Sequence, residues 1–288
     1  MADEPQVYLN GRYVPRSEAK LDVEDRGAMF ADGVYEVVRY YNGHAFAMGE
    51  HVARLRRSLE QIDLPVPADV ARLEEIADEL VRINTMPDAR VYWQVTRGAG
   101  PRQHVPATAM TPTVLVMTTR LEPVDFTAPA AMIRLTVAED QRWARCDIKS
   151  LALLPNVLAA MRAHEAGFDE VALQRGGVVT EGSHTTLFMV KDEQLFTHPA
   201  DKRILPGVTR SLVIDVARKA GITVHERAFT VEQMCNADEL IVTGTTTHLA
   251  AVVQVDNVVV GSVPPAVGDV TMRLYRAYLD LLAPFYAK

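Results

Sequence analysis

Two Asn-Gly dipeptides near the start of the chain constrain its fold more than any other feature. Asn10-Gly11 and Asn42-Gly43 lie within "VYLNGRYVP" and "VVRYYNGHAFAM", between runs rich in β-branched and aromatic residues. Asn-Gly between such runs is the strongest short signal for a two-residue β-hairpin, because both residues accept positive φ. The sequence therefore predicts two antiparallel hairpins in this part of the chain.

Helical periodicity follows the second hairpin. Apolar residues recur at spacings of three and four, which predicts two helices, one carrying Val52, Leu55, Leu59 and Ile62 and the next carrying Val70, Leu73, Ile76 and Leu80. Strands are predicted over 89–97 and 113–119, with the Gly/Pro-rich loop "GAGPRQHVPATAMTP" between them. Residues 1–120 are thus predicted to form a small α+β domain.

A proline-containing stretch without periodicity, residues 121–130, is predicted to link this domain to a larger one over 131–288. Strands of the larger domain are predicted at 132–139, 170–174, 185–191 and 193–198 and within 239–261. Its first predicted helix is interrupted at Pro155 and ends at Gly167. A second has Thr209 as N-cap and ends at Gly221, and a third closes the chain at 267–286. The expected fold class is α+β.

Composition excludes several classes of function. The net charge is −7 with no concentrated basic stripe, which argues against a nucleic-acid surface. No apolar run approaches the ~18 residues that span a bilayer, and the acidic start "MADEPQVYLNG" is unlike a signal peptide. Only two cysteines occur, Cys146 and Cys235, far apart, which fits a reduced cytoplasm and excludes a Cys-x-x-Cys site. A cytoplasmic enzyme without a metal site is expected.

Lys149 stands out because it lies among apolar residues in "RWARCDIKSLALLPN". In an extended segment Arg145, Asp147 and Lys149 share one face, and Cys146 and Ile148 share the other. A lysine amine held near apolar walls can act as a nucleophile, as Schiff-base chemistry requires. On its own, a lysine of this kind is more often a surface or salt-bridged residue than a nucleophile.

Four further features have both a chemical and an ordinary interpretation. Glu181-Gly182-Ser183 is predicted as a turn ahead of a strand, where the carboxylate is a cap or a catalytic partner. The helix start at Val208-Thr209 offers free N–H groups and a hydroxyl for a phosphate, or simply caps the helix. The hydroxyl-rich "VTGTTTHL" is a second phosphate turn or a β-turn, and Arg54 lies on a helix close to His51.

Together these features suit pyridoxal 5′-phosphate. This cofactor needs a lysine amine, a carboxylate on the pyridine nitrogen and donors for its phosphate. The candidate phosphate donors are Arg54, Thr209, the N–H of Val208 and the Gly244-Thr245 turn. The carboxylate follows the lysine here, whereas it precedes the lysine in the commonest aminotransferase architecture.

The sequence resembles the fold-type IV pyridoxal-phosphate aminotransferases, and among them the bacterial D-amino-acid transaminases. The matching stretches run almost the whole length: "EDRGAMFADGVYEVVRYYNG", "EHVARLRRS", "YWQVTRGAGPRQH", "EDQRWARCDIKSLALLPNVLA", "VTEGS", "HPADKRILPGVTR" and "DELIVTGTTT". The resemblance implies a two-domain fold with the cofactor in the cleft between the domains.

The resemblance also implies residue roles. Lys149 would be the Schiff-base and proton-shuttling lysine, and Glu181 the partner of the pyridine nitrogen. Leu205 would pack against the cofactor ring. The phosphate would be held by Arg54, Val208, Thr209, Gly244 and Thr245.

The substrate carboxylate would be bound by Arg102 and His104, the family's Arg-x-His pair, together with Tyr35. A guanidinium binds a carboxylate in bidentate fashion, which fixes the face of Cα presented to the lysine. In this family the Arg-x-His loop reaches into the neighbouring subunit, which implies a homodimer.

Two positions depart from the family pattern. The stretch after Glu181-Gly182 is "SHTT" where the family is serine-rich and ends in asparagine, so His184 is new. Gly244 replaces a hydroxyl residue in the phosphate turn, although its backbone N–H can still donate.

The expected function is ping-pong transamination of D-amino acids, of the D-alanine or D-glutamate type, with 2-oxo acids. Alternatives on the same scaffold are a branched-chain L-aminotransferase, in which an Arg-x-His loop is not expected, and an R-amine transaminase, which has a remodelled carboxylate trap. An aminodeoxychorismate-type lyase is a third. A non-catalytic binding protein would be expected to lack Lys149 or Glu181, and this chain has both.

Overall fold

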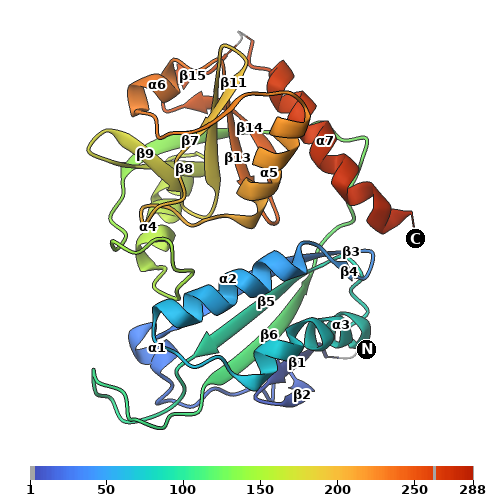
Figure 1. The fold of residues 1–288 in the computed structure, drawn as a ribbon, viewed down its shortest axis with the longest axis vertical. Helices are drawn as coiled ribbons and strands as arrows, with labels where there is room; N and C mark the ends of the chain where they lie inside the picture. Colours follow the sequence, from blue (N-terminus) through green and yellow to red (C-terminus); the bar gives the residue numbers. More distant parts are fainter. Residues whose placement is uncertain (1–3, 262–263, 288) are drawn as a thin grey trace. The chain divides into compact units, whose positions relative to one another are not determined.

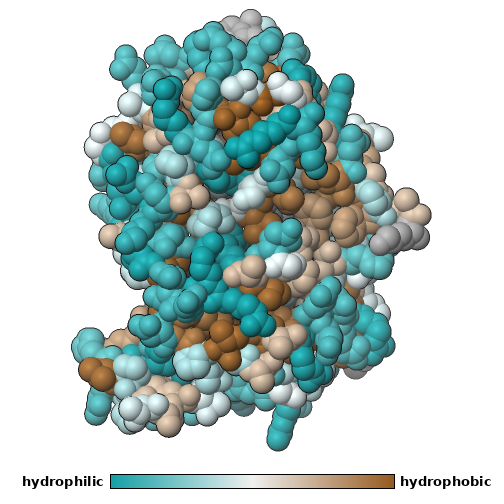
Figure 2. Space-filling model, viewed as in Figure 1, coloured by the Kyte–Doolittle hydropathy of each residue, from teal (hydrophilic) through white to brown (hydrophobic). Residues whose placement is uncertain are grey.

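The chain forms two compact units. The computed structural model describes residues 4–261 and 264–287. The first unit extends to Val124 and also takes in Ile148–Ala152, whereas the second comprises Asp125–Asp147 and Leu153–Ala287 (Figure 1). The chain therefore passes between the units three times. Hydrophilic side chains dominate the face of each unit seen in Figure 2.

An antiparallel sheet of six strands is the centre of the first unit, with the strand order β2-β1-β6-β5-β3-β4. In chain order the strands are β1 (Gln6–Leu9), β2 (Arg12–Pro15), β3 (Gly33–Tyr41), β4 (His44–Ala45), β5 (Ala89–Thr96) and β6 (Thr113–Arg120). Both Asn-Gly turns are confirmed, since Asn10, Gly11, Asn42 and Gly43 all have positive φ and join β1 to β2 and β3 to β4.

Helix α2 (Met48–Gln61), the 3-10 helix η1 (Ala68–Arg72) and helix α3 (Leu73–Ile83) pack on one face of this sheet. The unit also contains the short helix α1 (Arg26–Phe30). Leu55 and Leu59 of α2 and Leu80 of α3 share one core with Val38 and Trp93, and all five are fully buried (Figure 1). The predicted second helix is thus split, because its first turn is the separate 3-10 helix.

The five residues Ile148–Ala152 are built onto the sheet of the first unit. The N–H of Tyr35 donates to the carbonyl of Lys149 (2.9 Å), and the N–H of Leu151 donates to the carbonyl of Gly33 (3.0 Å). This pairing is available because β4 covers only the Tyr40–Tyr41 end of β3. Ile148 is buried in the same core as α2.

The second unit is built on a mixed sheet of nine strands in the order β12-β11-β10-β13-β14-β7-β8-β9, with β15 on β14. The strands are β7 (Ala131–Glu139), β8 (Glu170–Arg175), β9 (Val178–Gly182), β10 (Thr186–Lys191), β11 (Gln194–Thr197), β12 (Val224–Glu226), β13 (Glu239–Gly244), β14 (His248–Val255) and β15 (Val258–Val259). Strand β7 is central and runs parallel to both of its neighbours.

Four helices belong to this unit: α4 (Leu154–Glu165), α5 (Val208–Lys219), α6 (Val231–Cys235) and α7 (Asp269–Tyr286). Helix α4 contacts β7 and β8, whereas α5 and α7 contact each other and β13. The core of this unit includes Leu135, Leu187 and Val242.

Several boundaries differ from the sequence expectations. Glu181 lies within β9, and the turn follows at 183–185. Pro155 is the second residue of α4 and does not interrupt it, because an N–H in the first turn of a helix has no partner within the helix. The N-cap of α5 is Gly207, which places Thr209 inside the first turn. The single strand expected within 239–261 is three strands, β13, β14 and β15.

Candidate active site

Lys149 is held against β3 of the first unit. Its backbone N–H donates to the hydroxyl of Ser58 (3.3 Å), and its carbonyl pairs with β3. Its Nζ lies 4.3 Å from the centroid of the Tyr35 ring, a cation–π geometry. Tyr35 in turn stacks on Tyr92 at 5.7 Å, and burial raises the pKa of Tyr92 to about 12. The structure therefore brings Lys149 and Tyr35 together.

The expected extended conformation is wrong for the residues just before Lys149, where the chain turns at Cys146–Ile148.

Arg54 is held by a buried carboxylate. Its Nε and Nη2 donate to Glu36 at 2.7 and 2.8 Å, and Nδ1 of His51 lies 2.8 Å from the same carboxylate. Burial alone raises the pKa of Glu36, but the guanidinium of Arg54 and the ring of His51 hold it well below its usual range. Burial lowers the pKa of His51. Glu36 thus fixes the orientation of Arg54 from β3.

The Arg-x-His loop is anchored through α1. Arg26 donates to the carbonyls of Gln103 (2.6 Å) and His104 (3.2 Å). The Phe30 ring lies 5.6 Å from the ring of His104 and 5.3 Å from the guanidinium carbon of Arg102. Both side chains are exposed. The structure gathers the Arg-x-His pair around Phe30, and in the described part of the first unit no polar or ring contact joins the pair to Tyr35.

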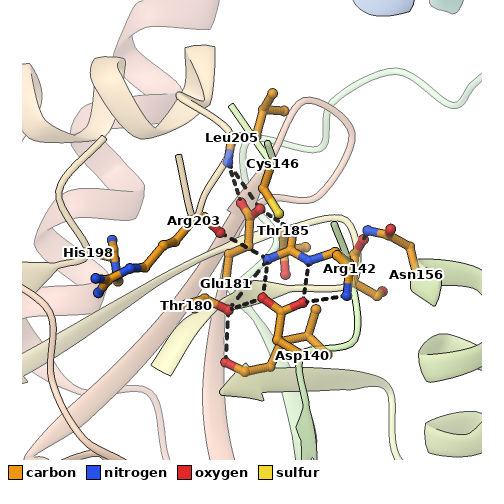
Figure 3. A network of polar contacts seen from close by, with 12 residues as sticks. Asp140, Arg142, Cys146, Asn156, Thr180, Glu181, Thr185, His198, Arg203 and Leu205 are labelled. Carbon is orange, nitrogen blue, oxygen red and sulfur yellow. Dashed lines mark hydrogen bonds and ion pairs between the residues drawn. The ribbon is translucent and has the colours of Figure 1, made fainter. Parts of the chain in front are cut away.

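In the second unit, Glu181 belongs to a network of carboxylates and arginines (Figure 3). Its two oxygens accept from the N–H of Leu205 at 3.0 and 3.2 Å, and one oxygen also pairs with Arg142. Arg142 lies between Glu181 and Asp140, to which it donates at 2.8 and 2.9 Å. Arg175 adds a second cation, 3.1 Å from Asp140.

Charge sharing shifts the pKa values in this network. Burial opposes the charged form of Arg142, yet Asp140 and Glu181 together raise its pKa. Burial would raise the pKa of Asp140, but Arg142 holds it below its usual range. Both carboxylates are buried. The arrangement keeps the carboxylate of Glu181 in one place, with Leu205 held beside it.

A candidate phosphate site lies at the start of α5. Its N-cap, Gly207, makes no side-chain capping bond, so the first N–H groups of the helix, on Val208 and Thr209, are suited to an anion. A Cβ on Gly207 would come 3.1 Å from the hydroxyl of Thr186. Thr186 pairs with Thr243, whose buried hydroxyl has no hydrogen-bond partner within the described residues.

The second predicted phosphate-binding turn lies at the end of β13. Gly244 ends β13, and Thr245 begins the turn to β14. A Cβ on Gly244 would lie 3.4 Å from the hydroxyl of Thr247, so glycine leaves the backbone accessible. The unit therefore brings Glu181, Leu205, the start of α5 and the end of β13 together through β9, β10 and β13.

These groups fit pyridoxal 5′-phosphate. The first unit offers a lysine amine, and the second offers a fixed carboxylate, an uncapped helix N-terminus and a buried hydroxyl without a partner among the described residues. These are the kinds of group that the cofactor requires. In the described ranges no group of three or more His, Cys, Asp or Glu could hold a metal ion. Within the same ranges, no helix has the length and apolar character to cross a membrane.

Fold and site together define a pyridoxal-phosphate-dependent enzyme of fold type IV. The profile of the family described as amino-transferase class IV matches residues 33–255. The chain belongs to this family and is a pyridoxal-phosphate-dependent aminotransferase, as the sequence predicted.

Relatives span nearly the whole chain. It is 40% identical over 283 residues to the D-alanine aminotransferase of Bacillus licheniformis, covering 98% of this chain and 99% of that one. The D-alanine aminotransferases of Listeria innocua and Staphylococcus haemolyticus are 42% and 37% identical, with at least 95% of each chain covered.

Solved structures confirm the fold class. The branched-chain amino acid aminotransferase of Escherichia coli superposes with a TM-score of 0.89 at 27% identity, covering 97% of this chain and 95% of that one. The branched-chain aminotransferase of Thermoproteus uzoniensis gives a TM-score of 0.87 at 26% identity, covering 98% of this chain and 96% of that one.

Sequence reasoning missed the residues that hold the predicted ones in place. Glu36 had a usable signal, since it interrupts the apolar face Val34, Glu36, Val38 of a strand, and an acid on a buried face needs a partner. Arg142 and Asp140 carry no local signal, because their link to Glu181 spans about forty residues.

Proposed function

We propose that this aminotransferase transfers the amino group of D-amino acids to 2-oxo acids by a ping-pong mechanism. The observation that carries the proposal is the identity of 37–42% to three D-alanine aminotransferases over at least 95% of each chain. The Arg102-x-His104 loop, anchored by Arg26, adds support, because it supplies a guanidinium for the substrate carboxylate.

Lys149 is proposed to carry out the proton transfers of the reaction. When bound, pyridoxal 5′-phosphate supplies the electron sink that makes the Cα proton of the amino acid removable. The amine of Lys149 would hold the cofactor covalently and, once free, would take the proton from Cα of the amino acid as a general base. As the conjugate acid it would deliver that proton to the cofactor, and with the 2-oxo acid it would move a proton in the opposite direction, back to Cα.

Glu181 is proposed to keep the pyridine nitrogen protonated. Its carboxylate is held by Arg142 and by the N–H of Leu205, so it needs little reorganisation to accept from that nitrogen. Leu205 would pack beside the ring. The phosphate would be bound by Arg54, Val208, Thr209, Gly244 and Thr245.

The substrate carboxylate is assigned to Tyr35, Arg102 and His104. Fixing that carboxylate decides which face of Cα meets the lysine, and therefore whether a D- or an L-amino acid reacts. The amino acid and the 2-oxo acid use the same donors, because both carry the carboxylate next to the reacting carbon.

A branched-chain L-aminotransferase is the second candidate. It is favoured by the TM-scores of 0.89 and 0.87 to two enzymes of that type. Their identities of 27% and 26% are lower than those of the D-alanine aminotransferases, and the Arg-x-His loop does not fit that alternative.

The substrate test uses the visible absorbance of the lysine-bound cofactor. The purified holoenzyme is mixed separately with D-alanine, D-glutamate, L-leucine and R-1-phenylethylamine, and the band is followed. We expect rapid loss with the D-amino acids and release of the matching 2-oxo acid. Loss with L-leucine alone would overturn the D-specific proposal, whereas elimination without amino transfer would indicate a lyase.

A lysine pair tests the catalytic assignment. Lys149→Ala should abolish both the visible band and turnover, because no other group is proposed to bind the cofactor covalently. Lys219→Ala, on the exposed end of α5, is the control and should keep both. A Lys149→Ala protein that retains the band and the turnover contradicts the assignment.

A homodimer in the cytoplasm is also proposed. Helix α4 carries Leu154, Val157, Leu158 and Met161 at helical spacing, all exposed in the single chain. A stripe of this kind fits contact with a second copy. Cys146 and Cys235 are free thiols, which supports a reducing compartment.

A further inference from the structure

The turn formed by Ser183, His184 and Thr185 is tied to a buried carboxylate. It joins β9, which carries Glu181, to β10. Glu170, the first residue of β8, reaches the turn with a side chain that is only 3% exposed. This residue has no role in the function proposed above.

Both oxygens of Glu170 are used by the turn. Oε1 accepts from the hydroxyl of Ser183 (2.6 Å) and from its N–H (3.1 Å), and Oε2 accepts from the hydroxyl of Thr185 (2.8 Å). From α4, Asn156 donates to the carbonyl of Ser183 (2.6 Å). Gly182 permits this approach, because a Cβ there would collide with the hydroxyl of Thr185.

His184 adds an imidazole nitrogen to the groups around this carboxylate. Its Nδ1 lies 3.1 Å from Oε2 of Glu170 and 2.9 Å from the hydroxyl of Ser183, while 66% of its side chain remains exposed. Among the described residues, no other Lys, Arg or His side chain lies within 4.0 Å of the Glu170 carboxylate. A buried carboxylate surrounded mainly by hydroxyl and amide donors gains from such a partner. This position is where the sequence departs from the family pattern.

The turn is placed between groups assigned to the cofactor. Glu181 lies two residues before Ser183, and Thr186, directly after the turn, lies against Gly207 at the start of α5. The carbonyl of His184 would be 3.9 Å from a Cβ on Gly244. Any shift of this turn therefore moves the ring carboxylate and both phosphate-binding segments.

We infer that Glu170 is a positioning residue for the cofactor, and that His184 strengthens this action by pairing with it. The inference rests on the proposed function. Glu170 acts by fixing the turn 183–185, and the turn fixes Glu181, the start of α5 and the end of β13. It does not touch the cofactor.

The main test is Glu170→Gln, which keeps the shape but places an amide donor opposite the donors of Ser183 and Thr185. We expect the dissociation constant of pyridoxal 5′-phosphate, measured by titrating the apoprotein, to rise about tenfold or more, and kcat to fall about tenfold. The KM for D-alanine should change less than threefold, because the carboxylate-binding residues are elsewhere. The visible absorbance maximum of the bound cofactor should shift.

The apoprotein gives an independent readout. Amide hydrogen exchange at 182–186 should be faster in Glu170→Gln than in the wild-type apoprotein. Glu193→Gln, a matched change at an exposed turn of the same unit, should leave exchange, affinity and kcat unchanged.

Substitutions at His184 should leave folding intact, because 66% of its side chain is exposed. His184→Ser should weaken cofactor binding, and His184→Arg, which keeps a long side chain with N–H donors, should restore most of it. In the Glu170→Gln background, His184→Ser should add no further loss, because its partner is gone.

The outcomes separate this inference from the function it rests on. Wild-type affinity, kcat and exchange in Glu170→Gln would overturn the positioning role, as would equal losses from His184→Ser in both backgrounds. If the wild-type protein binds the cofactor but does not transaminate D-amino acids, the proposed function fails while the affinity and exchange tests still decide on Glu170.

Discussion

Single residues in this enzyme act mainly by holding other residues. Arg142 is the clearest case, because its side chain is only 7% exposed and is shared by Asp140 and Glu181. The guanidinium matches two carboxylates at once, which a lysine cannot do with the same geometry. Without this guanidinium, the two buried carboxylates have less positive charge nearby to offset the free-energy cost of burying them.

We therefore expect Arg142→Met to lower the free energy of unfolding of the apoprotein by about 3–5 kcal/mol. Cofactor affinity should also fall, because Glu181 loses its main partner. Urea denaturation measures the first effect and titration of the apoprotein the second. Arg203→Met, at an exposed arginine of the same unit, is the control and should cost at most about 1 kcal/mol. Equal effects of the two variants would contradict the special role of Arg142.

Acid sensitivity follows from Glu36 and Asp140. Their partners, chiefly Arg54 and Arg142, hold both pKa values below the ordinary carboxyl value of about 4. The unfolded chain then binds more protons than the folded one as pH falls below about 4–5, so stability present at neutral pH is lost in that range.

Urea denaturation from pH 7 to pH 3 measures this loss. Glu36→Gln should be less stable than wild type at pH 7, and its stability should decline less steeply on acidification. A decline as steep as that of wild type would show that Glu36 does not contribute to the acid sensitivity.

Secondary-structure elements show where local sequence suffices and where it does not. The two Asn-Gly hairpins are correct because the turn chemistry is contained in two residues. The start of α5 is wrong because Thr209 looks like a cap, yet Gly207 takes the extended N-cap conformation and no hydroxyl caps the helix. Strand β9 was missed because only its pairing with β8 reveals it.

A short helix that sequence reasoning overlooked yields a prediction. Thr230 accepts from the N–H of Gln233 (3.1 Å), and the side chain of Gln233 accepts from the N–H of Thr230 (2.9 Å), which is a capping box at the start of α6. Thr230→Ala should cost about 1 kcal/mol, which lowers the melting temperature by about 2–4 °C. Thr230→Ser keeps the hydroxyl and should melt close to wild type. A similar fall in both variants would exclude the cap as the cause.

In the candidate site, too, some residues could be predicted from the sequence and others could not. Residues that react or bind, such as Lys149 and Glu181, could be proposed from chemistry and resemblance, since their types are fixed by the cofactor. Residues that hold them, such as Arg142 and Glu170, could not, because strand pairing and not sequence distance brings them into contact.

At the scale of the whole molecule, α4 gives the test of assembly. A single chain has a mass of 31.8 kDa, so a homodimer should give about twice that value by light scattering. Val157→Glu with Met161→Glu places charges on the exposed apolar stripe and should shift the mass toward that of one chain. Glu165→Ala at the end of the same helix is the control. A wild-type protein with the mass of one chain contradicts the dimer.

The three passages of the chain between the units have a consequence for recombination with relatives. A crossover at Val124 would appear to exchange whole modules, yet it would separate Gly33 and Tyr35 from the segment Ile148–Ala152 that pairs with them. The reactive lysine would then come from one parent and its supporting strand from the other. Functional chimeras should therefore inherit Ile148–Ala152 with the first unit, although this segment lies more than twenty residues beyond that boundary.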